Sequence, residues 1–238
     1  MPSWFTLDGG NCEDVGIHVL EYPPFVLAER RRKEFTVPGG NTQYVFDGAW
    51  GYEDVTLPIR CTVDEDADMT AVIEFLLPDY RHIIFGNDPG YVRTGVLTNQ
   101  VDIEKVLRER KKRNFTAEYR CSPFKHLAVQ PADIVITASS AVLSHPGTAR
   151  AYPVIKVEGS GSGKITLHAV DEFAVTGLVS GEPLIIDSGA MICTDADGLE
   201  DLSYKTAGDY PWLDPGDNLI QLSGGITRVT VTPNWAWL

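Results

Sequence analysis

Histidines, cysteines and clustered carboxylates are the side chains of this 238-residue chain that could do metal or nucleophilic chemistry. The histidines share no metal-ligand spacing and are too scattered to argue a Ser–His–Asp triad; they are His18, His82, His126, His145 and His168. The cysteines form no C-x-x-C pair, which favours buried free thiols over a zinc site or a disulfide framework; they are Cys12, Cys61, Cys121 and Cys193.

Two acidic clusters superficially look like calcium-binding loops. The cluster at 64–68 lacks the glycine and the later glutamate that such a loop needs, and the cluster at 195–198 lacks an oxygen-bearing side chain at its fifth position. A helix start and a turn explain them with fewer assumptions. The sequence therefore predicts no metal, no cofactor and no catalytic residue.

One segment, Leu184-Ile185-Ile186-Asp187-Ser188-Gly189-Ala190, looks like the catalytic loop of aspartic peptidases. Those enzymes need two carboxylates that share a proton. They also need a later apolar-Gly loop, and too little chain follows Ala190 to supply it. A strand that ends in an Asp-Ser-Gly turn is favoured, because turns prefer these residue types. The peptidase stays as the less favoured alternative.

Composition limits the class of protein further. The apolar fraction of 43% fits a globular protein, and a net charge of −13 argues against a nucleic-acid binder. An acidic surface would instead suit a wall along which DNA slides without sticking. Neither a membrane-spanning apolar run nor a signal-peptide layout is present, which predicts folding in the cytoplasm.

Two basic runs, 29–34 and 108–113, interrupt the acidic background. Each is typical of a solvated loop or strand edge, and a charged contact to an acidic neighbouring subunit is the alternative. We predict inter-subunit contacts from the second run and from two tryptophans near the end of the chain. These candidates are Arg108, Arg110, Lys111, Lys112, Arg113, Trp235 and Trp237.

The glycine-rich block in AYPVIKVEGSGSGKITLHA (151–169) predicts a β-hairpin. Folding the chain about Gly161 places Glu158 opposite Lys164 and Val157 opposite Ile165, so opposite charges meet and apolar residues meet. A flexible linker would need no such symmetry. The patterns of a phosphate-binding loop and of a nucleophile elbow both fail here.

The remaining pattern is one of short strands separated by turn residues, which indicates sandwiches or barrels. Residues 115–121 and 226–231 alternate as half-buried strands. One short helix is expected after Asp68, with Met69, Val72, Ile73 and Leu76 on its buried face and Pro78 as its stop. Residues 101–113 are interpreted as a strand that enters a long hairpin with a basic tip, although a helix would also fit.

Two prolines in the aperiodic segment 123–135 suggest a domain boundary. We expect two all-β domains, at 1–135 and 136–232. The tail, 233–238, holds two tryptophans and is expected to pack back on the first domain or on a partner. Three aromatic residues, Trp50, Tyr210 and Trp212, could stack on sugar rings, although packing or subunit contact is the more common role of such residues.

Several stretches, in this order and at this spacing, resemble the distal tail proteins of long-tailed, non-contractile bacteriophages. They span nearly the whole chain and are 16–19, 34–40, 115–123, 146–161, 184–188, 213–220 and 229–235. The chain departs from the family at Gly40-Asn41, where a charged residue is usual, and at Asn234, where arginine is frequent. The resemblance also accounts for the Ile-Asp-Ser turn without protease activity.

This resemblance implies an all-β protein of two domains. The first is a ring-forming, sandwich-like or barrel-like domain with one helix, and the second is a galectin-like or carbohydrate-module-like sandwich. It also implies a homo-hexameric hub at the tail tip of the virion, assembled in the host cytoplasm. The expected partners are the tail tube protein, the tape measure protein and a tail-associated lysin or fibre protein, and DNA would cross the bore unbound. A carbohydrate-binding module that contacts the host wall is the alternative function.

Overall fold

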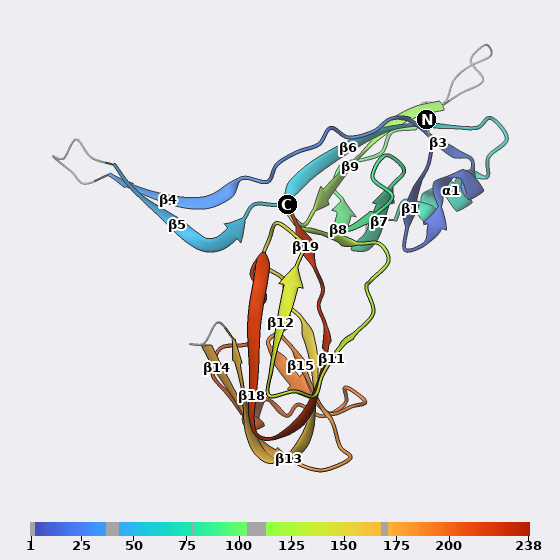
Figure 1. Cartoon of the computed structure of the whole chain (residues 1–238). Coiled ribbons are helices and arrows are strands. Elements are labelled where there is room, and N and C mark those ends of the chain that lie inside the picture. The colour runs from blue at the N-terminus through green and yellow to red at the C-terminus, as the bar shows by residue number, and fades with distance from the viewer. Residues whose placement is uncertain (1–2, 37–42, 78, 104–112, 168–170) are drawn as a thin grey trace. The chain divides into compact units, whose positions relative to one another are not determined.

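The structure is a computed structural model that describes residues 3–36, 43–77, 79–103, 113–167 and 171–238. Contacts divide the chain into two compact units. Unit 1 comprises Met1–Val129 with Leu238, and unit 2 comprises Gln130–Trp237. Both are built from strands, as Figure 1 shows, and the prediction of a two-domain all-β fold with one short helix is confirmed.

Unit 1 is built mainly from antiparallel strands. Its elements are β1 (Phe5–Leu7), β2 (Gly10–Asn11), the 3₁₀ turn η1 (Cys12–Val15), β3 (Ile17–Glu21), β4 (Arg30–Thr36), β5 (Gln43–Tyr52), β6 (Val55–Val63), α1 (Met69–Phe75), β7 (Arg81–Phe85), β8 (Tyr91–Leu97), β9 (Arg113–Cys121) and β10 (Lys125–Leu127). The main sheet has the order β2-β1-β7-β8-β9-β6-β3, and β10 pairs with β8. The central pair, β6 and β9, runs in register from Val55 opposite Cys121 to Val63 opposite Arg113.

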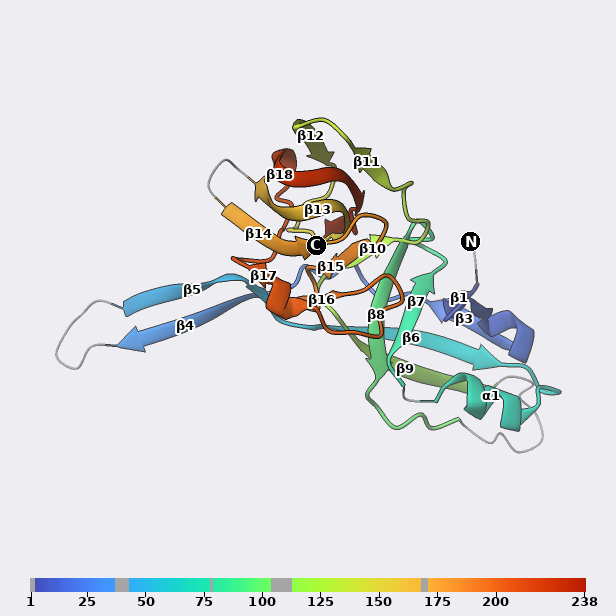
Figure 2. The same cartoon turned by 90° about the horizontal axis from the view of Figure 1, so that it is seen from below.

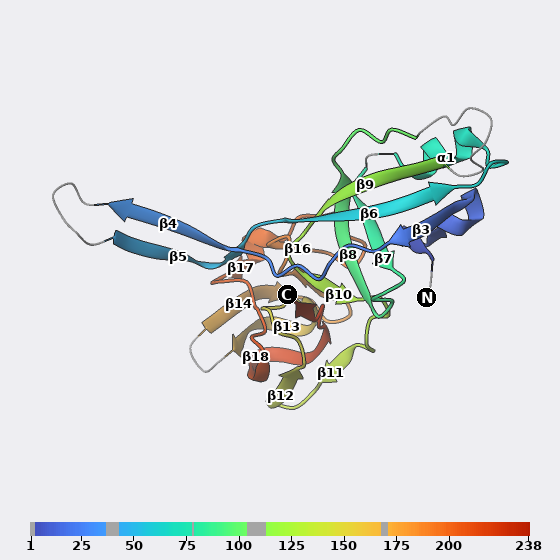
Figure 3. The same cartoon turned by 90° about the horizontal axis from the view of Figure 1, so that it is seen from above.

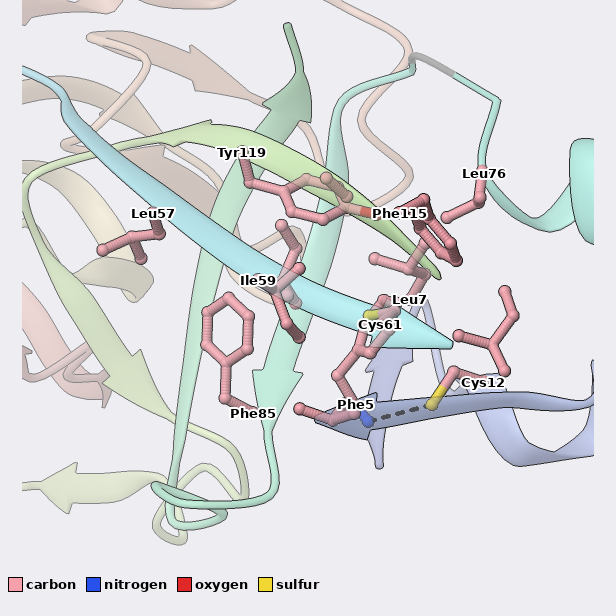
Figure 4. Packing of buried hydrophobic residues seen from close by; sticks show 14 of the residues in the cluster. Phe5, Leu7, Cys12, Leu57, Ile59, Cys61, Leu76, Phe85, Phe115 and Tyr119 are labelled. Carbon is pink, nitrogen blue, oxygen red and sulfur yellow. Dashed lines mark hydrogen bonds between the residues drawn. The ribbon is translucent and has the colours of Figure 1, made fainter. Parts of the chain in front are cut away.

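The core of unit 1 lies on one face of this sheet. The predicted alternation of β9 is confirmed, because Phe115, Ala117, Tyr119 and Cys121 are all buried. Figure 4 shows side chains from β1, β6 and β9 pointing toward one another. The ring of Phe5 lies edge-on to Tyr119, with centroids 6.2 Å apart. Close packing of this kind is what makes burial stabilising.

Helix α1 begins directly after Asp68, as predicted; it ends at Phe75, and the predicted stop, Pro78, lies outside the described residues. The Asp68 side chain accepts a hydrogen bond from the Thr70 amide, which satisfies one of the free donors at the helix start. Val72 and Leu76 pack into the core, as expected. Ile73 was also expected in the core, but it is 59% exposed. The helix has only two turns, so its buried stripe is too narrow to include Ile73.

Strands β4 and β5 form a separate two-stranded sheet. Their antiparallel register runs from Thr36 opposite Gln43 to Arg30 opposite Tyr52, with an irregularity between Arg30 and Arg32. Figure 3 shows the two strands pairing with each other only. A two-stranded ribbon without a covering layer is marginally stable in water. The basic run at 29–34 lies largely on β4, as the strand interpretation expected, and its contact with a neighbouring subunit stays a prediction.

Unit 2 is a second all-β body. Its elements are β11 (Ile134–Ile136), β12 (Ser140–His145), β13 (Val154–Leu167), β14 (Asp171–Leu178), β15 (Leu184–Asp187), β16 (Ile192–Thr194), the 3₁₀ turn η2 (Ser203–Lys205), β17 (Thr206–Ala207), β18 (Gly216–Thr232) and β19 (Ala236–Trp237). The central path of its sheet is β11-β18-β13-β14-β17, and Figure 2 shows the strands curling around one another.

The prediction of a β-hairpin about Gly161 is wrong. Residues 154–167 form one long strand, β13, which runs beside β18 from Val154 opposite Thr232 to Leu167 opposite Ile220. The first half of β13 pairs on its other side with β15, and the second half pairs with β14. The pattern looked symmetric because each half buries alternate residues in the same core. It does not mean that the halves face each other.

Glycines occupy the place where β13 and β18 bend together. The register shifts between Glu158 and Gly163. A methyl group built on Gly163 would lie 2.6 Å from the carbonyl oxygen of Ser223, and one on Gly225 would overlap the carbonyl oxygen of Ser160. Only glycine allows two backbones to approach this closely. The glycine-rich block is therefore the site of a bend within a strand pair.

Residues 233–237 of the tail belong to unit 2, and the expectation that 233–238 packs on the first domain or on a partner stays a prediction. Trp235 is only 6% exposed and stacks on His145, with ring centroids 4.6 Å apart. The carbonyl oxygen of Ala236 accepts hydrogen bonds from the amides of Thr148 and Ala149, both at 3.1 Å. Leu238 belongs to unit 1 and packs against its core.

The bend predicts a large difference between two glycine substitutions. We expect Gly225→Ala to lower the free energy of unfolding of unit 2 by about 3 kcal/mol, because its methyl group overlaps backbone. Gly161→Ala should cost about 1 kcal/mol, since Gly161 has a φ of 78° but open space around its Cβ position. Urea unfolding followed by hydrogen exchange of β13 and β18 measures both, and equal costs would contradict the steric argument.

Candidate functional site

The carboxylate of Asp187 is held by its own turn. Its Oδ1 accepts hydrogen bonds from the amides of Gly189 and Ala190, both at 2.9 Å, directly after β15 ends. This is the turn geometry that Asp favours at a strand end. The prediction of a structural Asp-Ser-Gly turn is confirmed, and these hydrogen bonds explain why Asp occurs at position 187.

The acidic clusters have structural partners as well. Asp68 caps α1, and Asp195 Oδ1 accepts from the amides of Leu199 at 2.8 Å and Glu200 at 3.2 Å. The expected roles at a helix start and in a turn are confirmed. Within the described ranges, no three His, Cys, Asp or Glu side chains gather closely enough to hold a metal ion.

The four cysteines are buried and free, as predicted. Burial raises the pKa of Cys12 to about 11 and the pKa values of Cys121 and Cys193 to about 12. Burial also raises the pKa of Cys61. A thiol that stays protonated at neutral pH is a poor nucleophile, so these residues serve packing.

Four of the five basic contact candidates lie outside the described residues, namely Arg108, Arg110, Lys111 and Lys112. Arg113 opens β9 opposite Val63 and is half-buried. In the other basic run, Arg31 Nε lies 3.2 Å from Glu53 Oε1. The inter-subunit role of the 108–113 run stays a prediction.

The two tryptophans of the tail differ in how far they are buried within the chain. Trp235 is buried against His145 in unit 2, so a contact within the chain already accounts for it. Trp237 lies in β19 and is half-buried. A contact from Trp237 to another subunit stays a prediction.

The aromatic residues considered for sugar stacking are engaged within the chain. The Arg150 guanidinium lies over the Trp212 ring, 4.6 Å from its centroid, and Tyr210 packs on Phe173 with centroids 5.2 Å apart. The side chain of Trp50 lies outside the described residues. Two depressions of unit 2, of about 320 and 350 Å³, are lined without any aromatic residue. Stacking on sugars therefore has no support from these surfaces.

Two exposed apolar patches of unit 1 were not predicted. The connector patch consists of Leu20 in β3 and of Phe25, Val26 and Leu27 in the segment between β3 and β4; Phe25 is 82% and Leu27 is 76% exposed. The helix patch lies on and just after α1 and consists of Ile73, Leu77 and Tyr80. Large exposed apolar side chains that cluster in this way mark protein contacts. The available signal was an apolar triplet, Phe25-Val26-Leu27, that no strand or helix period explains.

No helix among the described residues is both long and apolar enough to cross a membrane.

Comparisons with known proteins identify the fold. No protein-family model matches the chain, and no curated protein matches it in sequence. Among solved structures, the chain has the two-domain all-β fold of a phage distal tail protein. That structure is the Dit protein (gp 19.1) of phage SPP1, described as a paradigm of the hub adsorption apparatus in phages that infect Gram-positive bacteria. The two share 15% identity and a TM-score of 0.76 over 98% of this chain and 99% of that chain.

A second solved structure is less similar. It is the baseplate of phage P2 in its activated conformation with Ca, whose matching chain has 6% identity and a TM-score of 0.49, over 97% of this chain and 98% of that chain.

The connector patch predicts a separation between folding and assembly. We expect the double variant Phe25→Ser, Leu27→Ser to keep the free energy of unfolding within about 0.5 kcal/mol, because both side chains are exposed. Self-association that covers the patch should weaken. Sedimentation over a concentration series measures this, with Val142→Ser, an exposed valine of β12, as the matched control. Unchanged self-association would show that the patch is not an interface between copies.

Proposed function

We propose that this chain is a structural hub subunit of a phage tail tip. The single observation that carries the proposal is the fold likeness to the SPP1 Dit protein, which extends over almost the full length of both chains. A match that includes both units, in chain order, is more specific than a match to either sandwich alone. The residues with possible chemistry fit a structural role, since their hydrogen bonds are made to their own turns and their thiols are buried.

In this proposal, unit 1 forms a homo-hexameric ring. Two features of the unit support self-association: the β4–β5 ribbon, which is a sheet of two strands, and the two exposed apolar patches. A two-stranded ribbon gains stability when another surface covers it. In a closed ring of identical subunits, the same contact is repeated at every interface, so that one type of contact covers these surfaces on all subunits.

The ring would join the tail tube protein on one side to a tail-tip hub, lysin or fibre protein on the other. The tape measure protein and later DNA would pass through its bore. The net charge of −13 supports passage without binding, because an acidic wall repels phosphate. The subunit would be made in the host cytoplasm and would function in the virion.

The mass of the assembled protein tests this proposal. We expect particles of six times the 26.2 kDa protomer mass, and rings with an open centre by electron microscopy. Because some rings close only on their neighbours, the same measurement is made with the tail tube protein added. A chain that stays monomeric under both conditions, or a closed particle without a channel, would contradict the hub function.

The variant Phe25→Ser, Leu27→Ser connects the patch to this function. If the connector patch is part of the ring, the variant should yield folded protomers and few rings in the same micrographs. Rings as abundant as those of the unaltered chain would leave the hub function intact and would assign the ring contact to another surface.

A further inference from the structure

His145, the last residue of β12, is a buried ionisable group with both ring nitrogens in use. The residue is 2% exposed. Its Nδ1 accepts a hydrogen bond from the Gly147 amide at 2.9 Å, and its Nε2 lies 2.7 Å from the carbonyl oxygen of Ala149. An amide can only donate and a carbonyl can only accept, so the hydrogen bonds define the tautomer. The ring is neutral, with its proton on Nε2.

The loop that His145 shapes also holds the tail. The Thr148 and Ala149 amides donate to the carbonyl oxygen of Ala236, and the Trp235 ring stacks on the imidazole. Gly147 is so close to Ala236 that a methyl group in its place would overlap the Ala236 carbonyl oxygen. The imidazole, the loop and the start of the tail therefore form one packed assembly, which we name the tail clamp (residues 145–149 with 235–236).

The part of the tail held in the clamp is short. Strand β19 has two residues, and the Thr148 and Ala149 amides both donate to the single carbonyl oxygen of Ala236. A local contact of this size can open without unfolding the rest of unit 2.

A second proton on the imidazole is incompatible with the clamp. Protonated Nδ1 would be a donor that faces the donating Gly147 amide, so one hydrogen bond would be lost and two N–H groups would be opposed. The charge would also be buried. The negative charge of Asp214 favours the protonated ring. However, the Asp214 carboxylate already forms an ion pair with Arg150, whose Nε lies 2.9 Å from Asp214 Oδ1. The surroundings therefore favour the neutral ring.

We propose that the tail clamp is an acid-sensitive latch: protonation of His145 releases residues 235–236 from the loop at 145–149 within unit 2. The inference goes beyond the hub function and does not depend on ring assembly, because every group in the clamp belongs to one chain.

The direction of the pH dependence follows from the site. Burial lowers the pKa of His145 below its ordinary value of 6.5, and this effect exceeds the opposing effects of the Ala149 hydrogen bond and of Asp214. The released state binds the proton more readily than the docked state does. The clamp is therefore fully stable above the ordinary histidine pKa and loses stability as the pH falls through the lowered value.

Hydrogen exchange of the full chain tests the latch. The readout is the protection of the Gly147, Thr148 and Ala149 amides at pH 7 and pH 5, corrected for the intrinsic pH dependence of exchange. We expect protection to fall at least tenfold in the unaltered chain, while amides of β13 and β14 stay protected. Carboxypeptidase should remove the tail faster at pH 5 over the same range.

Two variants separate the latch from general acid denaturation. In His145→Gln the amide offers one acceptor and one donor at every pH, so clamp protection should change by less than twofold between pH 7 and pH 5. His145→Asn serves the same purpose if the longer amide does not fold. His82→Gln, which replaces a 68% exposed side chain on β7, is the matched control and should behave as the unaltered chain.

Three outcomes would overturn the proposal. The first is clamp protection that is unchanged at pH 5 in the unaltered chain. The second is an equal loss of protection in His145→Gln, which would place the sensitivity elsewhere. The third is a simultaneous loss of protection in β13 and β14, which would show that unit 2 unfolds as a whole. None of these outcomes bears on whether the chain forms rings.

Discussion

The close backbone contact between β13 and β18 is the constraint on which unit 2 depends. Strands β11 and β12 pair with β18, strands β14 and β15 pair with β13, and β16 and β17 attach beyond them. All the other strands of the sheet therefore attach, directly or through a neighbour, to one bent strand pair. The bend needs residues without a side chain at Gly159, Gly163, Gly224 and Gly225, where a methyl group would overlap the opposite backbone. These four glycines thus determine where the strand pair bends.

The sequence predicts buried faces better than it predicts strand partners. Alternation at 115–121 correctly identified the buried side of β9, and Asp68 correctly identified the start of α1. The same reasoning failed at 151–169, because alternation reports which face is buried and contains no information about which strand lies alongside. Lys164 pairs with Glu172 of β14, at 2.7 Å, and not with Glu158. The glycine pair Gly224-Gly225 in β18, which lies against the glycine-rich block of β13, indicates the true partner strand.

The candidate site was harder to predict than the fold, for a physical reason. Reactive residue types are visible in a sequence, and Asp187 and the cysteines were correctly assigned to structure. An exposed apolar patch has no such residue types. Phe25 and Leu27 have the side chains of a core, and only the folded unit shows that they lie outside it. Their exposure is informative because the core of unit 1 is complete without them.

Burial has opposite consequences for the thiols and for the imidazole of His145. It keeps Cys12, Cys121 and Cys193 protonated, and the protonated thiol is the form that packs, so acid changes nothing. It keeps His145 deprotonated, and the deprotonated ring is the form whose Nδ1 accepts a hydrogen bond from the Gly147 amide. Acid therefore acts on a group whose neutral state is part of a hydrogen-bond pattern. This difference makes the histidine, and not the thiols, the place where proton concentration can alter the structure.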